Sequence, residues 1–313
     1  MDRLSPLRRA SGIVRLHGHR GARGVLPENT LLGFAHCFDI GVEVVELDVL
    51  CTSDGVPVIT HNPRLMAAST RDAAGRWLSE EGPLIHDLTW DALQSYDIGG
   101  LQAGTDYGAR YPDQAFLTGQ HIPRLEDVAH LLQQPENAHV WLNLEIKSHP
   151  ERPAATPPLP DYVASILGVL RGEGLLDRVI LQSFDWRVLE VIADKSPEVP
   201  RSYLTYAPRA DAPMDVNVFE GSPWIGSASW AQFDGSLPRL ISHLGGMVWS
   251  PHHSDLVPED VALAQDLGLI VNTWTVNTGP EINAAIDAGV DGIITDYPGR
   301  AQRVLLERGL CWR

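Results

Sequence analysis

Residues 17–24 read His-Gly-His-Arg-Gly-Ala-Arg-Gly, and residues 27–30 read Pro-Glu-Asn-Thr. An apolar run at 13–16 leads into this stretch, and a helical pattern of apolar residues begins at Leu31. Pro27 suits the loop before a helix, and Asn29 or Thr30 can cap the free N–H groups of the first helical turn. The stretch therefore predicts a strand, a polar glycine-containing turn and a helix. It places an imidazole and a guanidinium where the strand ends.

The same order of strand and helix recurs along the rest of the chain. Further strands are indicated by apolar, β-branched runs at 42–51, 140–146, 179–183, 203–206, 247–249, 269–276 and 292–295. With the first strand they make about eight strand–helix units. Such alternation predicts a parallel sheet, and eight units in one domain favour a closed (β/α)8 TIM barrel spanning 13–313. Functional side chains of such a barrel lie at the C-terminal ends of its strands.

Three regions depart from this pattern. Residues 62–120 are rich in glycine, aspartate and isolated aromatics, with one short helical stretch at 87–95. We expect them to form a small insertion after the second strand that lies over one mouth of the barrel. Residues 208–235 show no clear helical or strand periodicity of apolar residues. Residues 1–12 are basic, and we expect a loose N-terminal arm.

Composition excludes several classes of protein. The 313 residues are 44% hydrophobic, which is enough for the core of one large barrel. A net charge of −16 argues against binding nucleic acid through a basic surface. The three cysteines form no CxxC pair, which favours reduced thiols and a cytoplasmic protein. No apolar stretch has the length of a membrane span, so a soluble protein is expected. The oligomeric state is left open.

Three carboxylates lie on predicted strands. Glu46 and Asp48 are two residues apart in one strand, so both side chains point to the same side. Acids in a buried strand are costly unless they are paired or bind a metal. Glu145 lies at the end of another strand. A cluster of oxygen ligands favours Mg²⁺, Ca²⁺ or Mn²⁺ over zinc.

Two histidines and two cations occupy similar strand-end positions. His19 and His61 together suit acid–base chemistry near neutral pH, although a single histidine is more often structural. Arg20 and Lys147, with a metal, could hold a phosphate group and offset its developing charge. Trp274, near the end of the seventh strand, is expected to line the site; packing inside the barrel is the alternative.

Two rival functions are weaker. Barrels with paired carboxylates often cleave sugars, but a neutral sugar needs no cluster of cations. A non-catalytic phosphoester-binding barrel would be expected to have lost a histidine or an acid, and none is missing.

The ordered motifs resemble the glycerophosphodiester phosphodiesterase family. The similar segments are His19-Arg20-Gly21, 27–30, Glu46-Leu47-Asp48, Thr52, Asp54-Gly55, His61, Glu145-Ile146-Lys147, 274–277 and 295–298. The resemblance implies a TIM barrel, a divalent metal and hydrolysis of glycerophosphodiesters to sn-glycerol 3-phosphate and an alcohol. Lysophospholipids are a variant substrate, as in a lysophospholipase D-type reaction.

The resemblance also implies roles for individual residues. His19 and His61 would be the acid–base pair, Glu46, Asp48 and Glu145 would hold the metal, and Arg20 and Lys147 would hold phosphate.

One position departs from the family pattern. The family usually has aspartate after the second histidine, whereas this chain has His61-Asn62. Because neighbours along a strand point in opposite directions, we expect Asn62 not to orient the His61 ring. The alcohol leaving group is not identified by these motifs, and residues 62–120 and 208–235 are expected to shape the choice.

Overall fold

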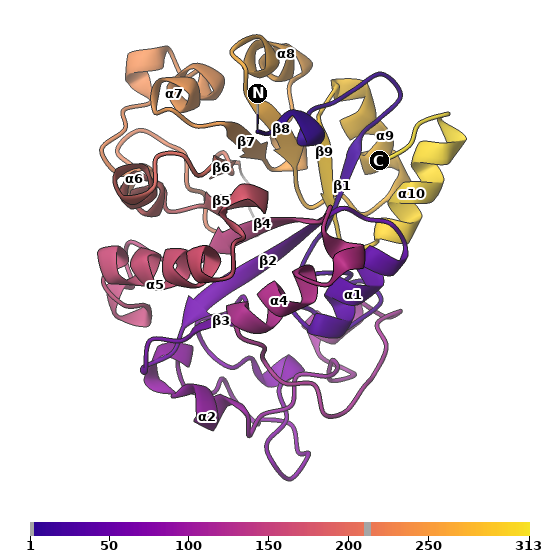
Figure 1. Cartoon of the computed structure of the whole chain (residues 1–313), viewed down its shortest axis with the longest axis vertical. Helices are drawn as coiled ribbons and strands as arrows, with labels where there is room; N and C mark the ends of the chain where they lie inside the picture. Colours follow the sequence, from indigo (N-terminus) through magenta and orange to yellow (C-terminus); the bar gives the residue numbers. More distant parts are fainter. Residues whose placement is uncertain (1–2, 210–213) are drawn as a thin grey trace.

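The computed structural model describes residues 3–209 and 214–313, and every element named below lies in these ranges. Eight parallel strands close into a barrel, because β1 pairs with both β9 and β2 (Figure 1). They are β1 (Arg15–Gly18), β2 (Val44–Cys51), β4 (Trp141–Ile146), β5 (Val179–Ser183), β6 (Arg201–Thr205), β7 (Val248–Pro251), β8 (Ile270–Thr273) and β9 (Gly292–Thr295). The predicted (β/α)8 barrel is confirmed.

A helix follows each barrel strand and packs outside the sheet (Figure 1). These helices are α1 (Leu31–Asp39), α4 (Leu125–Leu132), α5 (Leu159–Gly172), α6 (Trp186–Lys195), α7 (Leu237–His243), α8 (Pro258–Asp266), α9 (Gly279–Ala288) and α10 (Pro298–Glu307). The sequence did not predict α7, since seven residues are too short to show a helical period. It follows the irregular region at 208–235, of which 210–213 lie outside the described residues.

Strand β2 shows how the barrel positions the site. All eight of its residues are buried, because one face meets the helices and the other faces the barrel interior. Val45, Leu47 and Val49 belong to the main hydrophobic core. Glu46 and Asp48 alternate with them, so the two acids point inward.

The insertion between β2 and α4 begins with β3 (Pro57–Ile59), which pairs antiparallel with β2. It also contains α2 (Trp90–Leu93) and α3 (Asp106–Arg110). A small core of its own is formed by Leu65, Ile85, Leu93 and Ile122, packed on Leu50 and Val58. Figure 1 shows this region extending to one side of the barrel, beside α4 and β3. The sequence pattern did not indicate this second core.

The N-terminal arm is not loose, and that prediction was wrong. Leu4 and Leu7 are 2% and 3% exposed, although they precede the first strand. They pack against inward-facing residues at the starts of the strands: Val44, Trp141, Ile180, Val248 and Ile270. We call these five strand residues the barrel floor. The arm closes the N-terminal end of the barrel, because this apolar floor would otherwise face water. Within the described residues, no helix has the length and apolar character needed to cross a membrane.

Candidate active site

The turn after β1 carries His19 and Arg20 to the C-terminal end of the barrel. Arg20 and Gly21 both have left-handed backbone conformations, with φ of 50° and 84°. A Cβ atom at Gly21 would come within 2.8 Å of the Gly33 backbone, so the close approach of the turn to α1 requires glycine. Thr30, one of the two predicted caps, accepts a hydrogen bond from the Gly33 N–H at 3.1 Å.

Glu46, Asp48 and Glu145 form a buried acid cluster. One oxygen of each lies within 4.8 Å of the others. Burial, followed by the charges of Asp48 and Glu145, raises the pKa of Glu46 well above its ordinary value. Burial also raises the pKa of Glu145 against the opposing charge of Lys147. Burial opposes ionisation of Asp48 too, but nearby cations, with Arg20 first, hold its pKa below the usual range.

This acid cluster fits a divalent metal. Asp48 Oδ1 is buried and accepts no hydrogen bond from any described residue. The Nζ atom of Lys147 lies 3.7 Å from Asp48 Oδ1 and 2.7 Å from Glu145 Oε1. Three buried carboxylates beside two cations, Lys147 and Arg20, leave negative charge that a hard cation would neutralise.

Arg20 ties the turn to the acid cluster. Its backbone N–H donates to Glu46 Oε2 at 3.0 Å, and its Nε lies 3.1 Å from Asp48 Oδ2. Nη1 donates to Glu28 Oε1 at 2.9 Å. Glu28 also accepts a hydrogen bond from the hydroxyl of Tyr107, which lies on α3 of the insertion. The insertion is thereby linked to the turn that holds the guanidinium.

His19 is held by the carboxylate of Asp296, which directly follows the last barrel strand. Its Nδ1 lies 2.6 Å from Asp296 Oδ1, and its Nε2 lies 3.7 Å from Glu46 Oε2. Arg23 donates to both oxygens of Asp296, at 2.8 and 3.1 Å. Burial and the charge of Arg23 lower the pKa of His19 to about 4, although Asp296 opposes the shift.

His61 is held by Asn62, which corrects the sequence prediction. Its Nδ1 lies 2.8 Å from Asn62 Oδ1. The two residues follow the end of β3 in a bend, so the alternation of a strand does not apply to them. Burial, then the charges of Arg20 and Lys147, lowers the pKa of His61 well below its ordinary value.

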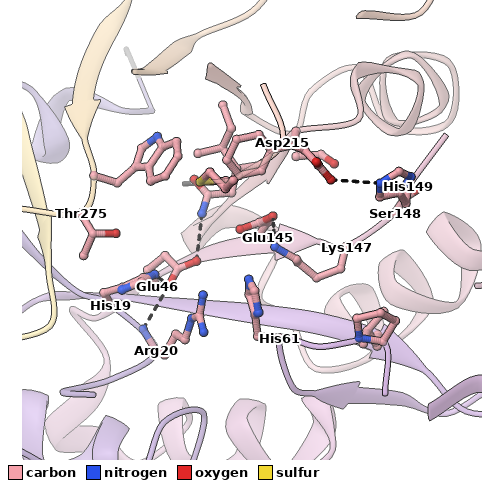
Figure 2. A pocket seen from close by; sticks show the side chains of 18 of the residues that line it. His19, Arg20, Glu46, His61, Glu145, Lys147, Ser148, His149, Asp215 and Thr275 are labelled. Atoms are coloured by element: carbon pink, nitrogen blue, oxygen red, sulfur yellow. Dashed lines mark hydrogen bonds and ion pairs between the residues drawn. The ribbon is translucent and has the colours of Figure 1, made fainter. Parts of the chain in front are cut away.

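These groups face one pocket of about 440 Å³ (Figure 2). Seven of the eight predicted site residues line it: His19, Arg20, Glu46, His61, Glu145, Lys147 and Trp274. The eighth, Asp48, is fully buried within the acid cluster. Figure 2 shows His19, Arg20 and Glu46 at one end, and His149 and Asp215 at the other. The structure thus brings all eight predicted residues together.

Trp274 both lines the pocket and packs in the barrel, so the two alternatives hold at once. Only 8% of it is exposed, and its Nε1 donates to the Ser250 carbonyl at 2.8 Å. Its ring meets that of Phe184 edge to face, with centroids 5.1 Å apart.

The outer wall of the pocket comes from the β4–α5 and β6–α7 loops. His149 Nε2 lies 3.4 Å from Asp215 Oδ2, and the His149 ring packs edge to face on Trp224 at 4.5 Å. The irregular region at 208–235 therefore does contribute to the pocket, as expected. The insertion contributes Pro63 alone of residues 62–120, so it flanks the pocket and does not roof it.

Three residues of the site were missed by the sequence reasoning. Asp296 follows β9 directly, and its strand-end position was a usable signal. Arg23 lies in the opening stretch but was not distinguished from its neighbours. Tyr107 sits in an aperiodic region, where nothing in the local sequence indicates a contact with Glu28.

A comparison with known families fits this geometry. The model of the glycerophosphoryl diester phosphodiesterase family matches residues 19–300. The chain belongs to this family. It is accordingly an enzyme, a hydrolase of phosphodiesters.

Related proteins match this chain over most of its length. A glycerophosphodiester phosphodiesterase of Bacillus subtilis is 26% identical over 294 residues, covering 91% of this chain and 84% of that protein. The uncharacterised protein YqiK of the same organism is 28% identical over 294 residues, covering 94% and 99%.

Solved structures of similar proteins share its fold. One is the crystal structure of a Silicibacter pomeroyi protein that is named as a glycerophosphoryl diester phosphodiesterase. It matches this chain with a TM-score of 0.87 and 42% identity, and 99% of each chain is covered. A phosphodiesterase of Oleispira antarctica, in complex with its product sn-glycerol-3-phosphate, has a TM-score of 0.68 and 23% identity, with 94% and 98% covered. The second likeness is one of fold.

Proposed function

We propose that this phosphodiesterase hydrolyses glycerophosphodiesters to sn-glycerol 3-phosphate and an alcohol. The observation that carries the proposal is the meeting of three acids, two imidazoles and two cations at one site, where all of them except the buried Asp48 line a pocket of about 440 Å³. Family membership supports the reaction class. The product held by the Oleispira antarctica enzyme supports glycerol 3-phosphate as the retained half of the substrate.

The charged groups would bind the phosphate. Glu46, Asp48 and Glu145 would hold one divalent cation, Mg²⁺, Ca²⁺ or Mn²⁺, which supplies polarisation of a phosphoryl oxygen and neutralises developing charge. Arg20 and Lys147 would contact the remaining phosphoryl oxygens. Their fixed positions beside buried acids mean that little reorganisation is needed as charge develops.

The two histidines would move the protons. His61 is kept neutral by burial and adjacent cations. With Nδ1 facing Asn62, its Nε2 would take the proton of the nucleophile, either water or the neighbouring glycerol hydroxyl. Burial and Arg23 lower the pKa of His19 to about 4, and Asp296 opposes this shift. The negative charge of a bound phosphodiester would raise that pKa further, so His19 would hold the proton that it donates to the departing alkoxide. The hydroxyl route would pass through a cyclic phosphate, which water then opens.

The test is an assay of the purified protein on glycerophosphocholine, glycerophosphoethanolamine, glycerophosphoglycerol and lysophospholipids. We expect glycerol 3-phosphate as product, loss of turnover with chelator, and recovery with Mg²⁺, Mn²⁺ or Ca²⁺. Calorimetry should show weaker metal binding for Glu46→Gln, whereas Glu307→Gln, an exposed acid on α10, should match the wild type.

Each alternative has its own outcome in this assay. Full activity in excess chelator, with no metal retained, would remove the metal from the mechanism. Cleavage of lysophospholipids alone would favour the lysophospholipase D-type reaction. Binding of glycerol 3-phosphate without turnover of any diester would favour a non-catalytic barrel. A cytoplasmic location stays a prediction, which fractionation of the source cells would check.

A further inference from the structure

A polar layer crosses the barrel interior between the apolar floor and the acid cluster. Its members besides Glu46 are His17, Asn143, Gln182, Ser202, Ser250, Asn272 and Gly292. They face inward, since most lie two residues along a strand from a floor residue, as Asn143 does from Trp141 and Asn272 from Ile270. Layers of this kind are usually filled by bulky branched side chains. Here two serines and a glycine take the place of such side chains.

Several buried polar atoms in this polar layer have no partner among the described residues. They are His17 Nε2, Asn143 Oδ1, Gln182 Oε1 and both amide atoms of Asn272. None of these four residues is more than 1% exposed. A buried polar atom without a hydrogen bond costs about 1–3 kcal/mol. A set of this size without partners would therefore strongly lower the free energy of unfolding.

The unpaired atoms include both donors and acceptors. Asn143 Nδ2 is placed to donate to His17 Nδ1 at 3.4 Å, which leaves the hydrogen of the neutral ring on Nε2. Burial lowers the pKa of His17 to about 3, so the ring is neutral at physiological pH. His17 Nε2 and Asn272 Nδ2 are therefore unmet donors, while Asn143 Oδ1 and Asn272 Oδ1 are unmet acceptors.

Gly292 allows two of these atoms to lie close to the backbone of β9. A Cβ atom there would lie 2.4 Å from Asn272 Oδ1 and 3.1 Å from His17 Nε2. Both atoms thus border the same point on β9.

We propose that ordered water molecules occupy this polar layer, held by His17, Asn143 and Asn272. Water can accept from the unmet donors and donate to the unmet acceptors, whereas a metal cation would be repelled by the donors. The floor, with Leu4 and Leu7 packed on it, separates these waters from solvent below.

The proposed waters would extend the support of the acid cluster. Gln182 Nε2 donates to Glu46 Oε1 at 3.1 Å, which leaves Gln182 Oε1 as an acceptor on the other side of the amide. A water that donates to Gln182 Oε1 would polarise this amide and strengthen its bond to the carboxylate. The waters would thus help to orient Glu46 from below.

The test is a high-resolution crystal structure of the metal-loaded protein and of two variants. We expect at least one water at about 2.7–3.2 Å from both His17 Nε2 and an Asn272 amide atom. Asn272→Leu removes both amide atoms and fills the space, so it should lose that water. Thr273→Val is the matched control, because Thr273 is the next residue on β8 and its hydroxyl bonds to the Pro251 carbonyl at 3.0 Å. It should keep the water.

Oxygen-17 relaxation dispersion gives a second measurement, since it counts long-lived waters in solution. The count should fall in Asn272→Leu and stay unchanged in Thr273→Val. A direct bond from His17 Nε2 to Asn272 Oδ1 with no density between the strands would overturn the proposal. Density for a cation with only oxygen ligands would also overturn it. If Asn272→Leu does not fold, the wild-type electron density decides alone.

Discussion

At the scale of single residues, the two histidines differ in what each Nδ1 atom contacts. His19 faces the carboxylate of Asp296 at 2.6 Å, whereas His61 faces the amide of Asn62 at 2.8 Å. A carboxylate favours the protonated ring, while a neutral amide oxygen mainly selects which nitrogen carries the hydrogen. The difference supports His19 as the acid and His61 as the base.

The first prediction concerns removal of each imidazole ring. His19→Ala and His61→Ala should each lower kcat by roughly 10²–10⁴-fold, the usual contribution of one positioned acid or base. The double variant should lose less than the product of the two effects if the rings act as a unit. Steady-state kinetics measures this, with circular dichroism and metal content as controls. Near wild-type kcat in His61→Ala would exclude that residue from the chemistry.

The second prediction concerns Asp296. Asp296→Asn keeps the size of the side chain but removes the charge that favours protonated His19. It should lower kcat by less than the roughly 10²–10⁴-fold expected for loss of the ring itself. As a positioning residue it should leave metal affinity unchanged, and the rate should fall at a lower pH than in the wild type, since the acid loses its proton earlier. An unchanged pH profile would reduce Asp296 to a structural role.

The reciprocal substitution is Asn62→Asp, which places a carboxylate beside His61. A carboxylate raises the pKa of a histidine, and a general base loses function when it is protonated. The rise of kcat/KM with pH should therefore begin at a higher pH than in the wild type. A pH–rate profile measures the shift. No shift would mean that the proton on His61 does not limit the reaction.

At the scale of elements, the N-terminal segment at Ser5–Leu7 acts as part of the barrel floor. It lies before the first strand, yet Leu4 and Leu7 belong to one buried cluster with residues from five different strands. The acid cluster lies at the other ends of these strands, with the polar layer between them. The floor should accordingly govern stability and not catalysis.

The floor gives the fourth prediction. Leu7→Ala should lower the free energy of unfolding by about 2–5 kcal/mol, as for other leucines deleted from a core. Leu306→Ala is the control, because Leu306 on α10 is 61% exposed, and surface changes are usually within about 0.5 kcal/mol. Denaturant unfolding measures both variants, and kcat should be unchanged in each. Equal stability of the two variants would show that the arm is not part of the folded core.

At the scale of the whole molecule, the barrel interior is apolar at one end and increasingly polar toward the other. The floor is apolar, the polar layer follows, and the acid cluster and pocket lie above it. Burying so many polar groups makes stability depend on protonation. His17 is part of this dependence, since burial, with a contribution from Arg15, lowers its pKa from 6.5 to about 3.

The fifth prediction follows from His17. The unfolded chain binds a proton at His17 below pH 6.5, and the folded protein does so only below about pH 3. Stability is therefore lost as pH falls from 6.5, by at most about 1.4 kcal/mol per pH unit from this group. His17→Gln should flatten the decline between pH 6.5 and 4.5, measured by denaturant unfolding. His139→Gln, at an exposed histidine, is the control, and equal slopes in all three proteins would contradict the prediction.

Local patterns in the sequence predicted the barrel and the eight residues that its closure brings together. Strand alternation placed Glu46 and Asp48 on one face, and the strand-end rule of parallel barrels gathered Glu145, Lys147 and Trp274 with them. These inferences need only the period of apolar residues and the geometry common to parallel sheets. Neither inference depends on contacts between particular loops.

Tertiary structure alone decided how these residues are held. Asp296 reaches His19 from 277 positions away, and Tyr107 reaches Glu28 across 79. The bend after β3 turned Asn62 toward His61. The N-terminal arm, which looks basic in sequence, covered the barrel floor with Leu4 and Leu7. Such contacts arise where loops and ends without periodicity meet after the barrel closes. Their physical cause is the burial of polar and apolar groups that must find partners, and local sequence does not specify which partner lies nearest.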